Sequence, residues 1–275
     1  MQAKDAIDNG PALWALPPLR EGDHKYHRGH VALMGGAMTG AAKLAALAAQ
    51  RAGAGVVTLA SNRETWPIYA ASMASVITRP VDSVQDWSAL LRERKVNTVV
   101  LGPGMTPDAT LADAIHAAQA EQLPMILDAG ALELLAGSAP VRHVVEGSGA
   151  ILTPHEGEYR KLASTYKLDT AAIKPARACG LAKATGCIVL LKGDVSIIAA
   201  PDGMVVRNRA SAPQLASAGT GDVLAGMIAG LLAQGMRPFY AACAAAYLHA
   251  KAAQCIGRGL IAEDLIAALP SMFGR

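Results

Sequence analysis

The sequence has few aromatic residues and few charged residues, which limits the composition of its core and the kinds of partner that it can bind. Aromatic residues make up 4% and charged residues 17% of the 275 residues, whereas hydrophobic residues make up 52%. The core must therefore consist of Ala, Leu, Val and Ile, with small side chains packed closely between helices and strands. The formal net charge is only +3, and no basic stripe with aromatic residues between occurs, so we expect no nucleic acid partner.

Cysteine and long apolar runs are also scarce. The longest apolar helical runs, near 223–233 and 239–250, are too short and too rich in Ala and Gly to cross a membrane. The first 30 residues contain no signal-peptide apolar region. We therefore expect a cytoplasmic protein without a membrane partner. The cysteines form no CxxC pair, which predicts buried reduced thiols and no metal site, at Cys179, Cys187, Cys243 and Cys255.

Strands and helices alternate along most of the chain. After an irregular segment 1–30, a buried strand at 31–34 precedes a helix at 39–53, with Thr39 as N-cap and Gly53 as C-cap. The alternation predicts one α/β domain over residues 1–275, with a largely parallel central sheet flanked by helices and a C-terminal all-helical segment. The further strands are expected at 56–60, 98–101, 125–128, 150–153 and 187–191, with a hairpin at 195–200 and 204–207. The further helices are expected at 107–122, 131–136, 156–166, 170–185, 220–234, 238–255 and 262–269.

The stretch 217–232 carries the strongest chemical signal. Gly219 and Gly221 let a ligand approach the backbone, and the N–H groups of Gly219, Thr220 and Gly221 at a helix start form an anion hole. Asp222 follows in the first turn. A plain Gly-rich N-cap with an acid facing the helix dipole is the alternative, but a cap does not require two glycines. We therefore predict phosphoryl transfer, with Asp222 taking the proton of the acceptor hydroxyl.

Other polar residues follow predicted strands, where ligands of parallel sheets bind. We predict that Lys192 meets a nucleotide phosphate, the alternative being a solvent-exposed lysine at a hairpin edge. We assign His155 to a polar substrate rather than to a structural hydrogen bond. We expect Asp128 to cap the short helix after it rather than reach a ligand. Glu156 and Glu158 are interpreted as first-turn acids that favour the helix dipole without a further role.

Two glycine-rich strand exits and several isolated side chains are less informative. The segment 35–36 on its own indicates a tight turn, and 102–104 fits a ligand-facing loop and a rigid strand exit equally well. Neither a Walker A loop nor a dinucleotide-binding glycine pattern is present. Tyr247, His249 and the three tryptophans are isolated, so we expect them to serve in packing.

Several stretches together resemble the ADP-dependent NAD(P)H-hydrate dehydratases of the ribokinase-like superfamily. TPHEGE at 153–158 and AGTGDVLAG at 218–226, in this order, are specific to that family, and the resemblance covers nearly the whole chain. It implies a three-layer ribokinase-like fold. It also implies that ADP is the co-substrate for dehydrating the S epimer of NADHX or NADPHX to NADH or NADPH, with release of AMP and phosphate. The ring hydroxyl is phosphorylated first, and phosphate then leaves.

The resemblance also assigns residues and partners. It implies Mg²⁺, for which the sequence shows no ligand cluster, and a homo-oligomer, a tetramer. No epimerase domain precedes the matching region, so we expect a separate NAD(P)HX epimerase to act on the R epimer. The implied hydrate-binding residues are Ala41, Gly104, His155 and Asp222. The implied nucleotide-binding residues are Lys192, Gly193, Asp194, Val195, Ser196 and Gly221.

The chain departs from the family pattern at three places. Met105-Thr106 replaces Leu-Gly, Gly130 and Glu133 replace an Asp and an Asn, and the segment 211–214 lacks the usual Asn-Pro-Gly run. Two other functions therefore remain open: a small-molecule kinase for a vitamin precursor of the hydroxymethylpyrimidine, hydroxyethylthiazole or pyridoxal type, and a non-catalytic nucleotide-binding protein. The sequence leaves ADP against ATP, and NADHX against NADPHX, undecided.

Overall fold

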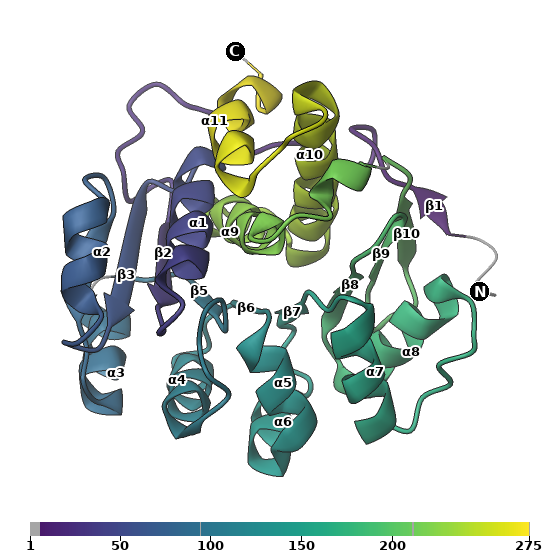
Figure 1. Cartoon of the computed structure of the whole chain (residues 1–275), viewed down its shortest axis with the longest axis horizontal. Helices are drawn as coiled ribbons and strands as arrows, with labels where there is room; N and C mark the ends of the chain where they lie inside the picture. Colours follow the sequence, from purple (N-terminus) through teal and green to yellow (C-terminus); the bar gives the residue numbers. More distant parts are fainter. Residues whose placement is uncertain (1–5, 94, 211, 275) are drawn as a thin grey trace.

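A ten-stranded sheet forms the middle layer of the protein, in the order β1-β10-β9-β8-β7-β6-β5-β2-β3-β4. The computed structural model describes residues 6–93, 95–210 and 212–274. Figure 1 shows α1, α9, α10 and α11 above the sheet and α3 to α8 below it. The strands are β1 (Ile7–Asp8), β2 (His30–Met34), β3 (Val56–Ser61), β4 (Ile77–Pro80), β5 (Thr98–Leu101), β6 (Met125–Leu127), β7 (Ile151–Leu152), β8 (Ile188–Leu191), β9 (Ser196–Ala199) and β10 (Val205–Asn208).

Helix α1 follows β2 in the upper layer, later helices alternate with the strands in the lower layer, and α9 to α11 close the chain in the upper layer (Figure 1). They are α1 (Thr39–Arg51), α2 (Trp66–Ser72), α3 (Val84–Glu93), α4 (Ala109–Ala120), α5 (Gly130–Gly137), α6 (Ala139–Val145), α7 (Glu156–Thr165), α8 (Lys174–Thr185), the 3₁₀ helix η1 (Pro213–Leu215), α9 (Thr220–Ala233), α10 (Pro238–Ile256) and α11 (Ala262–Met272). This order confirms the predicted three-layer α/β fold with an all-helical C-terminal segment. The assignment of residues 1–275 to one domain stays our proposal.

Strands β2 to β8 pair in parallel, whereas β9 runs antiparallel to both β8 and β10. The register Val205↔Ala199 confirms the predicted hairpin around Asp202. The expectation that 1–30 is wholly irregular is wrong, because Ile7 and Asp8 pair in parallel with β10. Two residues are too short to produce a readable alternation, so the strand depends on its partner.

Small residues bring α9 and α1 into close contact. A Cβ atom at Gly226 would collide with the carbonyl oxygen of Ala45, and one at Gly230 would collide with that of Ala49. Only glycine permits this backbone approach at these two positions. The contact places the first turn of α9 beside the first turn of α1, above the carboxyl ends of the central strands (Figure 1).

Several local predictions are corrected. Thr39 is not an N-cap, because the helix is capped at Met38 without a side-chain hydrogen bond. Cys255 is exposed and Cys179 half-buried, so only Cys187 and Cys243 are buried thiols. The sequence patterns predict no element between residues 61 and 97, yet this segment forms α2, β4 and α3. Within residues 6–93, 95–210 and 212–274, none of the helices combines the length and apolarity that a membrane crossing requires.

Candidate active site

The carboxyl ends of neighbouring strands bring four predicted positions into one row. The order β8-β7-β6-β5-β2 places Lys192, His155, Asp128 and Gly104 side by side along this edge, with Ala41 following β2. Parallel strands end at the same edge of a sheet, so residues far apart in the sequence meet there. The first turn of α9, with Asp222, lies above the row.

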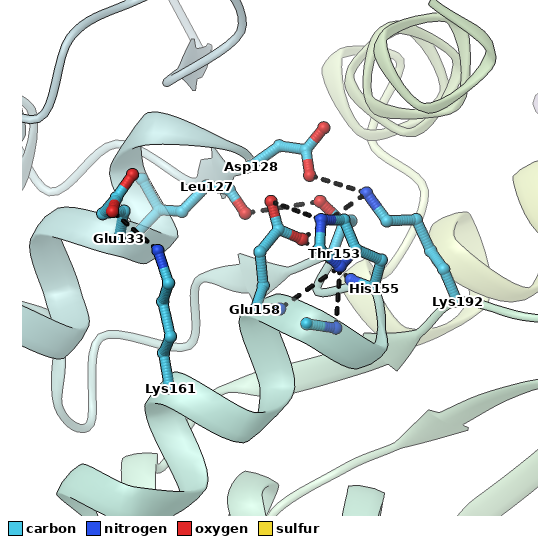
Figure 2. A network of polar contacts seen from close by, with 9 residues as sticks. Leu127, Asp128, Glu133, Thr153, His155, Glu158, Lys161 and Lys192 are labelled. Atoms are coloured by element: carbon cyan, nitrogen blue, oxygen red, sulfur yellow. Dashed lines mark hydrogen bonds and ion pairs between the residues drawn. The ribbon is translucent and has the colours of Figure 1, made fainter. Parts of the chain in front are cut away.

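Asp128 has a different role from the predicted one. Its buried carboxylate accepts a hydrogen bond from Lys192 Nζ at 2.9 Å, as Figure 2 shows. Helix α5 instead has Ala129 as N-cap, at φ +46°, without a side-chain cap. The cap prediction was wrong because the carboxylate is 3% exposed and needs a cationic partner in that environment.

Lys192 is the centre of an acidic cluster rather than a solvent-exposed lysine. Its ammonium nitrogen lies 4.0 Å from Glu158 Oε2, in addition to the Asp128 pair. Burial disfavours the charged form, but Asp128, Glu158 and Asp222 outweigh burial, so the pKa of Lys192 is raised. Lys192 therefore remains a fixed positive charge, which matches its predicted role at a phosphate. Glu158, interpreted as a first-turn acid only, also faces this charge.

Asp222 has the pKa of a general base. Burial, reinforced by the nearby charges of Asp128 and Glu158 and opposed by Lys192, raises the pKa of Asp222 to about 6. A base is most effective when its pKa lies near the working pH, because it is then ionised yet still basic. A first-turn acid that served only the helix dipole would have its pKa lowered instead.

The turn before α9 leaves backbone donors for an anion. Gly219 is the N-cap, in the left-handed conformation at φ +86°, and has no side chain to bond the helix N–H groups. The Thr220 hydroxyl donates to the carbonyls of Leu215 and Ser217 at 2.8 and 2.9 Å, so it holds the turn in place. A Cβ atom at Gly221 would lie 3.4 Å from Lys192 Nζ, so the lysine and the helix start face each other.

His155 lies at the predicted strand end, but its ring also forms structural hydrogen bonds. Its Nδ1 accepts from the N–H groups of Gly157 and Glu158 at 2.9 and 3.2 Å, and Glu158 accepts from the His155 N–H at 2.8 Å. This reciprocal pair is a capping box at the start of α7 (Figure 2). The side chain is 60% exposed, and its Nε2 lies 3.6 Å from Glu158 Oε1.

A cavity of about 560 Å³, here the α10 cavity, opens between the Lys192 loop, η1, the start of α9 and α10. Of the predicted nucleotide-binding set, Val195 does not line this cavity, and it is exposed. Asp222 does not line this cavity, although its neighbour Gly221 does. The lining includes Lys192, Gly193, Asp194, Ser196, Gly221 and also His155.

Ala41 and Gly104, from the predicted hydrate-binding set, lie together elsewhere. A Cβ atom at Gly104 would lie 3.2 Å from Ala41 Cβ, and Met38 N–H donates to the Gly104 carbonyl at 3.2 Å. The neighbouring segments 35–37 and 105–106 line a second cavity of about 460 Å³, here the α4 cavity, although Ala41 and Gly104 themselves do not. Of the predicted hydrate-binding set, His155 lines the α10 cavity, whereas Ala41 and Gly104 lie beside the α4 cavity.

The departures from the family pattern are structurally connected. A Cβ atom at Gly130 would collide with the carbonyl oxygen of Met105, so no other residue fits beside this loop as it stands. Glu133 pairs with Lys161 at 2.6 Å, on the side of α5 that faces α7 (Figure 2). Ser211, the first residue of the third departure, lies outside the described residues.

One residue of the α10 cavity was missed by sequence reasoning. His249 was expected to serve in packing, yet it lines the cavity and is 5% exposed. Among the described residues its Nε2 has no hydrogen-bond partner. The only sequence signal is a single imidazole within an Ala-rich helix, which is too common to identify a site.

The fold and this edge of the sheet define a ribokinase-like protein. A solved ribokinase-like superfamily protein from Enterococcus faecalis V583 has the same fold, with a TM-score of 0.78 at 23% identity over 94% of this chain and 91% of that one. The profile of the NAD(P)H-hydrate dehydratase family matches residues 31–268. The chain belongs to this family.

Relatives and solved structures agree with this assignment. The chain is 35% identical to an ADP-dependent (S)-NAD(P)H-hydrate dehydratase of Neisseria meningitidis, over 90% of this chain and 84% of the relative. It is 36% identical to a bifunctional NAD(P)H-hydrate repair enzyme of Moorella thermoacetica over 94% of this chain, and spans only 52% of that enzyme. A Bacillus subtilis ADP/ATP-dependent NAD(P)H-hydrate dehydratase co-crystallised with ATP and Mg²⁺ has a TM-score of 0.79 at 27% identity, covering 94% and 93%.

Proposed function

We propose that the protein dehydrates the S epimer of NADHX or NADPHX at the expense of ADP, giving NADH or NADPH, AMP and phosphate. The observation that carries the proposal is the buried Asp222 carboxylate, with its pKa raised to about 6, at an anion-binding helix start that faces Lys192. Asp222 can accept the proton of an acceptor hydroxyl there, and the helix start and Lys192 can bind the phosphoryl group that is transferred.

The phosphoryl step follows from the positions of the charges. Lys192 and the N–H groups at the start of α9 hold the β-phosphate of ADP, and Asp222 takes the proton of the ring hydroxyl as its oxygen bonds to phosphorus. The bond between phosphorus and the bridging oxygen of ADP breaks, which releases AMP. In the second step the ring nitrogen donates its electron pair, the ring C–O bond breaks with loss of a ring proton, and phosphate leaves with the former hydroxyl oxygen.

The site fits a magnesium ion that is held mainly by phosphate. Among the described residues no group of three His, Cys, Asp or Glu side chains is arranged to hold a metal. Mg²⁺ usually keeps several waters and takes one or two carboxylates together with substrate phosphates. Glu158 is the carboxylate that would contribute, since Asp128 already binds Lys192 and Asp222 takes the hydroxyl proton. When bound, the ion would neutralise charge on the transferred phosphoryl group.

We place the two substrates on opposite sides of the α9 start. ADP occupies the α10 cavity, with its phosphates at Gly221 and Lys192 to Ser196. The damaged ring lies at Asp222, towards Ala41 and Gly104, and the rest of its dinucleotide extends into the α4 cavity. The α4 lining includes Asp82, Asp108 and Asp113 and no basic residue among those described, which favours NADHX over the 2′-phosphorylated NADPHX.

The proposed function also includes partners. The Moorella relative, of which this chain spans 52%, is a bifunctional NAD(P)H-hydrate repair enzyme. The pairing with an NAD(P)HX epimerase stays a prediction. The homotetramer and the cytoplasmic location stay predictions.

The assay that tests the proposal incubates purified protein with (S)-NADHX, ADP and Mg²⁺ and follows NADH absorbance together with AMP. We expect NADH and AMP in equal amounts, and neither product when ADP is omitted. A vitamin-precursor kinase would instead convert ATP and a hydroxymethylpyrimidine, hydroxyethylthiazole or pyridoxal to the phosphate ester. Kinase turnover without NADH formation would reject the proposal, and so would nucleotide binding without turnover of either kind.

A further inference from the structure

The Lys192 to Ser196 loop forms one end of the α10 cavity, here the phosphate end, since the proposed function places the phosphates of ADP there. The first residue of this loop is held at both of its backbone polar groups. The Lys192 N–H donates to the Pro154 carbonyl at 2.8 Å, and the Lys192 carbonyl accepts from Lys174 Nζ at 2.9 Å. Lys174 is the first residue of α8 and does not itself line the cavity. A side chain outside the cavity therefore fixes the first peptide group of the loop.

The contact with Lys174 orients the peptide group between Lys192 and Gly193. This peptide is trans and planar, so its C=O and its N–H point in opposite directions. Because the carbonyl points to Lys174, the Gly193 N–H points away from Lys174. Among the residues that the structure describes, this N–H has no hydrogen-bond acceptor, and Gly193 lines the cavity. A free backbone donor in this position is suited to a phosphate oxygen.

Glu156 holds Lys174 in place. Its carboxylate accepts hydrogen bonds from Arg177 at 2.7 and 3.1 Å and lies 3.6 Å from Lys174 Nζ. The Arg177 hydrogen bonds and the charges of both cations lower the pKa of Glu156, so this carboxyl group stays ionised near pH 7. The side chains of Lys174 and Arg177 are only 19% and 15% exposed. Glu156 thus has a role beyond the helix dipole, because it anchors the ammonium group that binds the loop.

Gly193 leaves no room for a side chain between the loop and Lys174. Its φ of +151° lies in the region that favours glycine, and a Cβ atom there would collide with Lys174 Nζ. The lack of a side chain at this position therefore lets the ammonium group reach the Lys192 carbonyl.

We propose that Lys174 is a positioning residue for the co-substrate: it binds the Lys192 carbonyl and so directs the Gly193 N–H to a phosphate oxygen of ADP in the α10 cavity. Lys174 touches neither substrate, so its effect passes through the backbone of the loop. This inference rests on the proposed function for the presence of ADP, but on no chemical step. Loss of the ammonium group should therefore weaken nucleotide binding and leave the chemical step at saturating ADP nearly unchanged.

The test is Lys174→Met, which keeps most of the side-chain length but removes the charge and the donor. Arg177 still binds Glu156 in this variant. The Kd for ADP from calorimetry should rise about tenfold, the factor that corresponds to one charge-assisted hydrogen bond. The single-turnover rate at saturating ADP and (S)-NADHX should change by less than about threefold. Lys183→Met, which removes an exposed lysine from the last turn of α8, is the matched control and should bind ADP as the wild type does.

A double-mutant cycle with Gly193→Ala separates positioning from a general loss of stability. In the wild-type background the new Cβ atom displaces the Lys174 ammonium group, whereas in Lys174→Met there is no ammonium group to displace. The increase in Kd that Gly193→Ala causes should therefore be at least about threefold smaller in the Lys174→Met background. A substitution that only loosened the fold would give the same increase in both backgrounds.

Four results would overturn the inference: an unchanged Kd in folded Lys174→Met, an equal rise in Kd in Lys183→Met, a fall in the single-turnover rate as large as the loss of affinity, or additive effects of Lys174→Met and Gly193→Ala. ADP binding without turnover in the wild-type protein would reject the proposed function, while the comparisons of Kd would still test the positioning role.

Discussion

The two ends of the α10 cavity differ in how their buried polar groups are paired. At the Lys192 end, charges are paired within the protein: Lys192 binds Asp128 at 2.9 Å, and Glu156 forms two hydrogen bonds with Arg177 at 2.7 and 3.1 Å. At the His249 end the polar atom is neutral and has no protein partner among the described residues. The Lys192 end is thus organised by charge pairs within the protein, whereas the buried His249 imidazole is uncharged near pH 7.

This difference predicts two kinds of mutant. Changes at the phosphate end and at Asp222 should affect the chemical step and, where a charge is left unpaired, stability. Changes among the apolar residues of the same cavity should affect nucleotide affinity rather than the chemical step. Five further predictions test the first half of this contrast and the α4 cavity beyond it.

The largest effect is expected from Asp222→Asn. The amide keeps the shape but cannot take the hydroxyl proton, so kcat should fall by about 10³-fold or more while the Kd for ADP changes by less than about threefold. Single-turnover kinetics and ADP calorimetry measure the two quantities. Glu263→Gln, which changes an exposed first-turn acid of α11, is the control. An Asp222→Asn variant with substantial turnover would contradict the role of Asp222 as base.

The second effect concerns the Lys192–Asp128 pair. Lys192→Met should weaken ADP binding by about 10- to 100-fold and lower the Tm, because it leaves a buried carboxylate unpaired. Adding Asp128→Asn removes the unpaired charge, so the double variant should regain much of the Tm without regaining ADP affinity. If both properties returned together, Lys192 would be structural only.

The third effect is the pH dependence that Asp222 imposes. Its pKa of about 6 lies above the ordinary value of 3.8, so kcat/KM for the hydrate should rise with pH and level off above about pH 6 to 7. At pH 5 it should be about tenfold below the plateau.

The raised pKa of Asp222 also determines the direction in which folding stability changes with pH. A carboxyl group whose pKa is higher in the folded than in the unfolded protein stabilises the fold at low pH. This contribution to the free energy of unfolding is lost as the pH rises from the unfolded pKa through the folded pKa. Asp222→Asn, which carries no charge, should therefore be more stable than the wild type at pH 8, by about 1–3 kcal/mol, and similar to it at pH 3 to 4. Urea titrations at the two pH values measure this, and a variant that is less stable at pH 8 would mean that the carboxylate is favourably paired.

The smallest effect is expected in the α4 cavity. Asp113→Lys should shift the ratio of kcat/KM for NADPHX over NADHX upward by about threefold to tenfold, since a cation replaces an acid where we place the 2′-phosphate. Glu93→Lys, on the exposed end of α3, is the charge-matched control. An unchanged ratio would remove the dinucleotide from this cavity.

The sequence predicted the layers well because the βα alternation is local. Buried strands such as Thr98–Leu101 and the helix from Thr220 carry apolar patterns that need no partner to be recognised. The weak elements depended on tertiary contacts: β1 exists only through β10, and the pairing of Asp128 with Lys192 joins residues 64 positions apart. His249 was assigned to packing because only the folded structure shows that its helix lines the α10 cavity.

The central claim is that the hydroxyl of the hydrated ring attacks the β-phosphate of ADP with Asp222 as base, and then leaves with the phosphate. The direct test is a turnover of (S)-NADHX labelled with ¹⁸O in that hydroxyl, with the products separated and analysed by mass spectrometry. The account predicts that the label appears in inorganic phosphate. Label in water, with unlabelled phosphate, would show that dehydration does not pass through the phosphate ester and would contradict it.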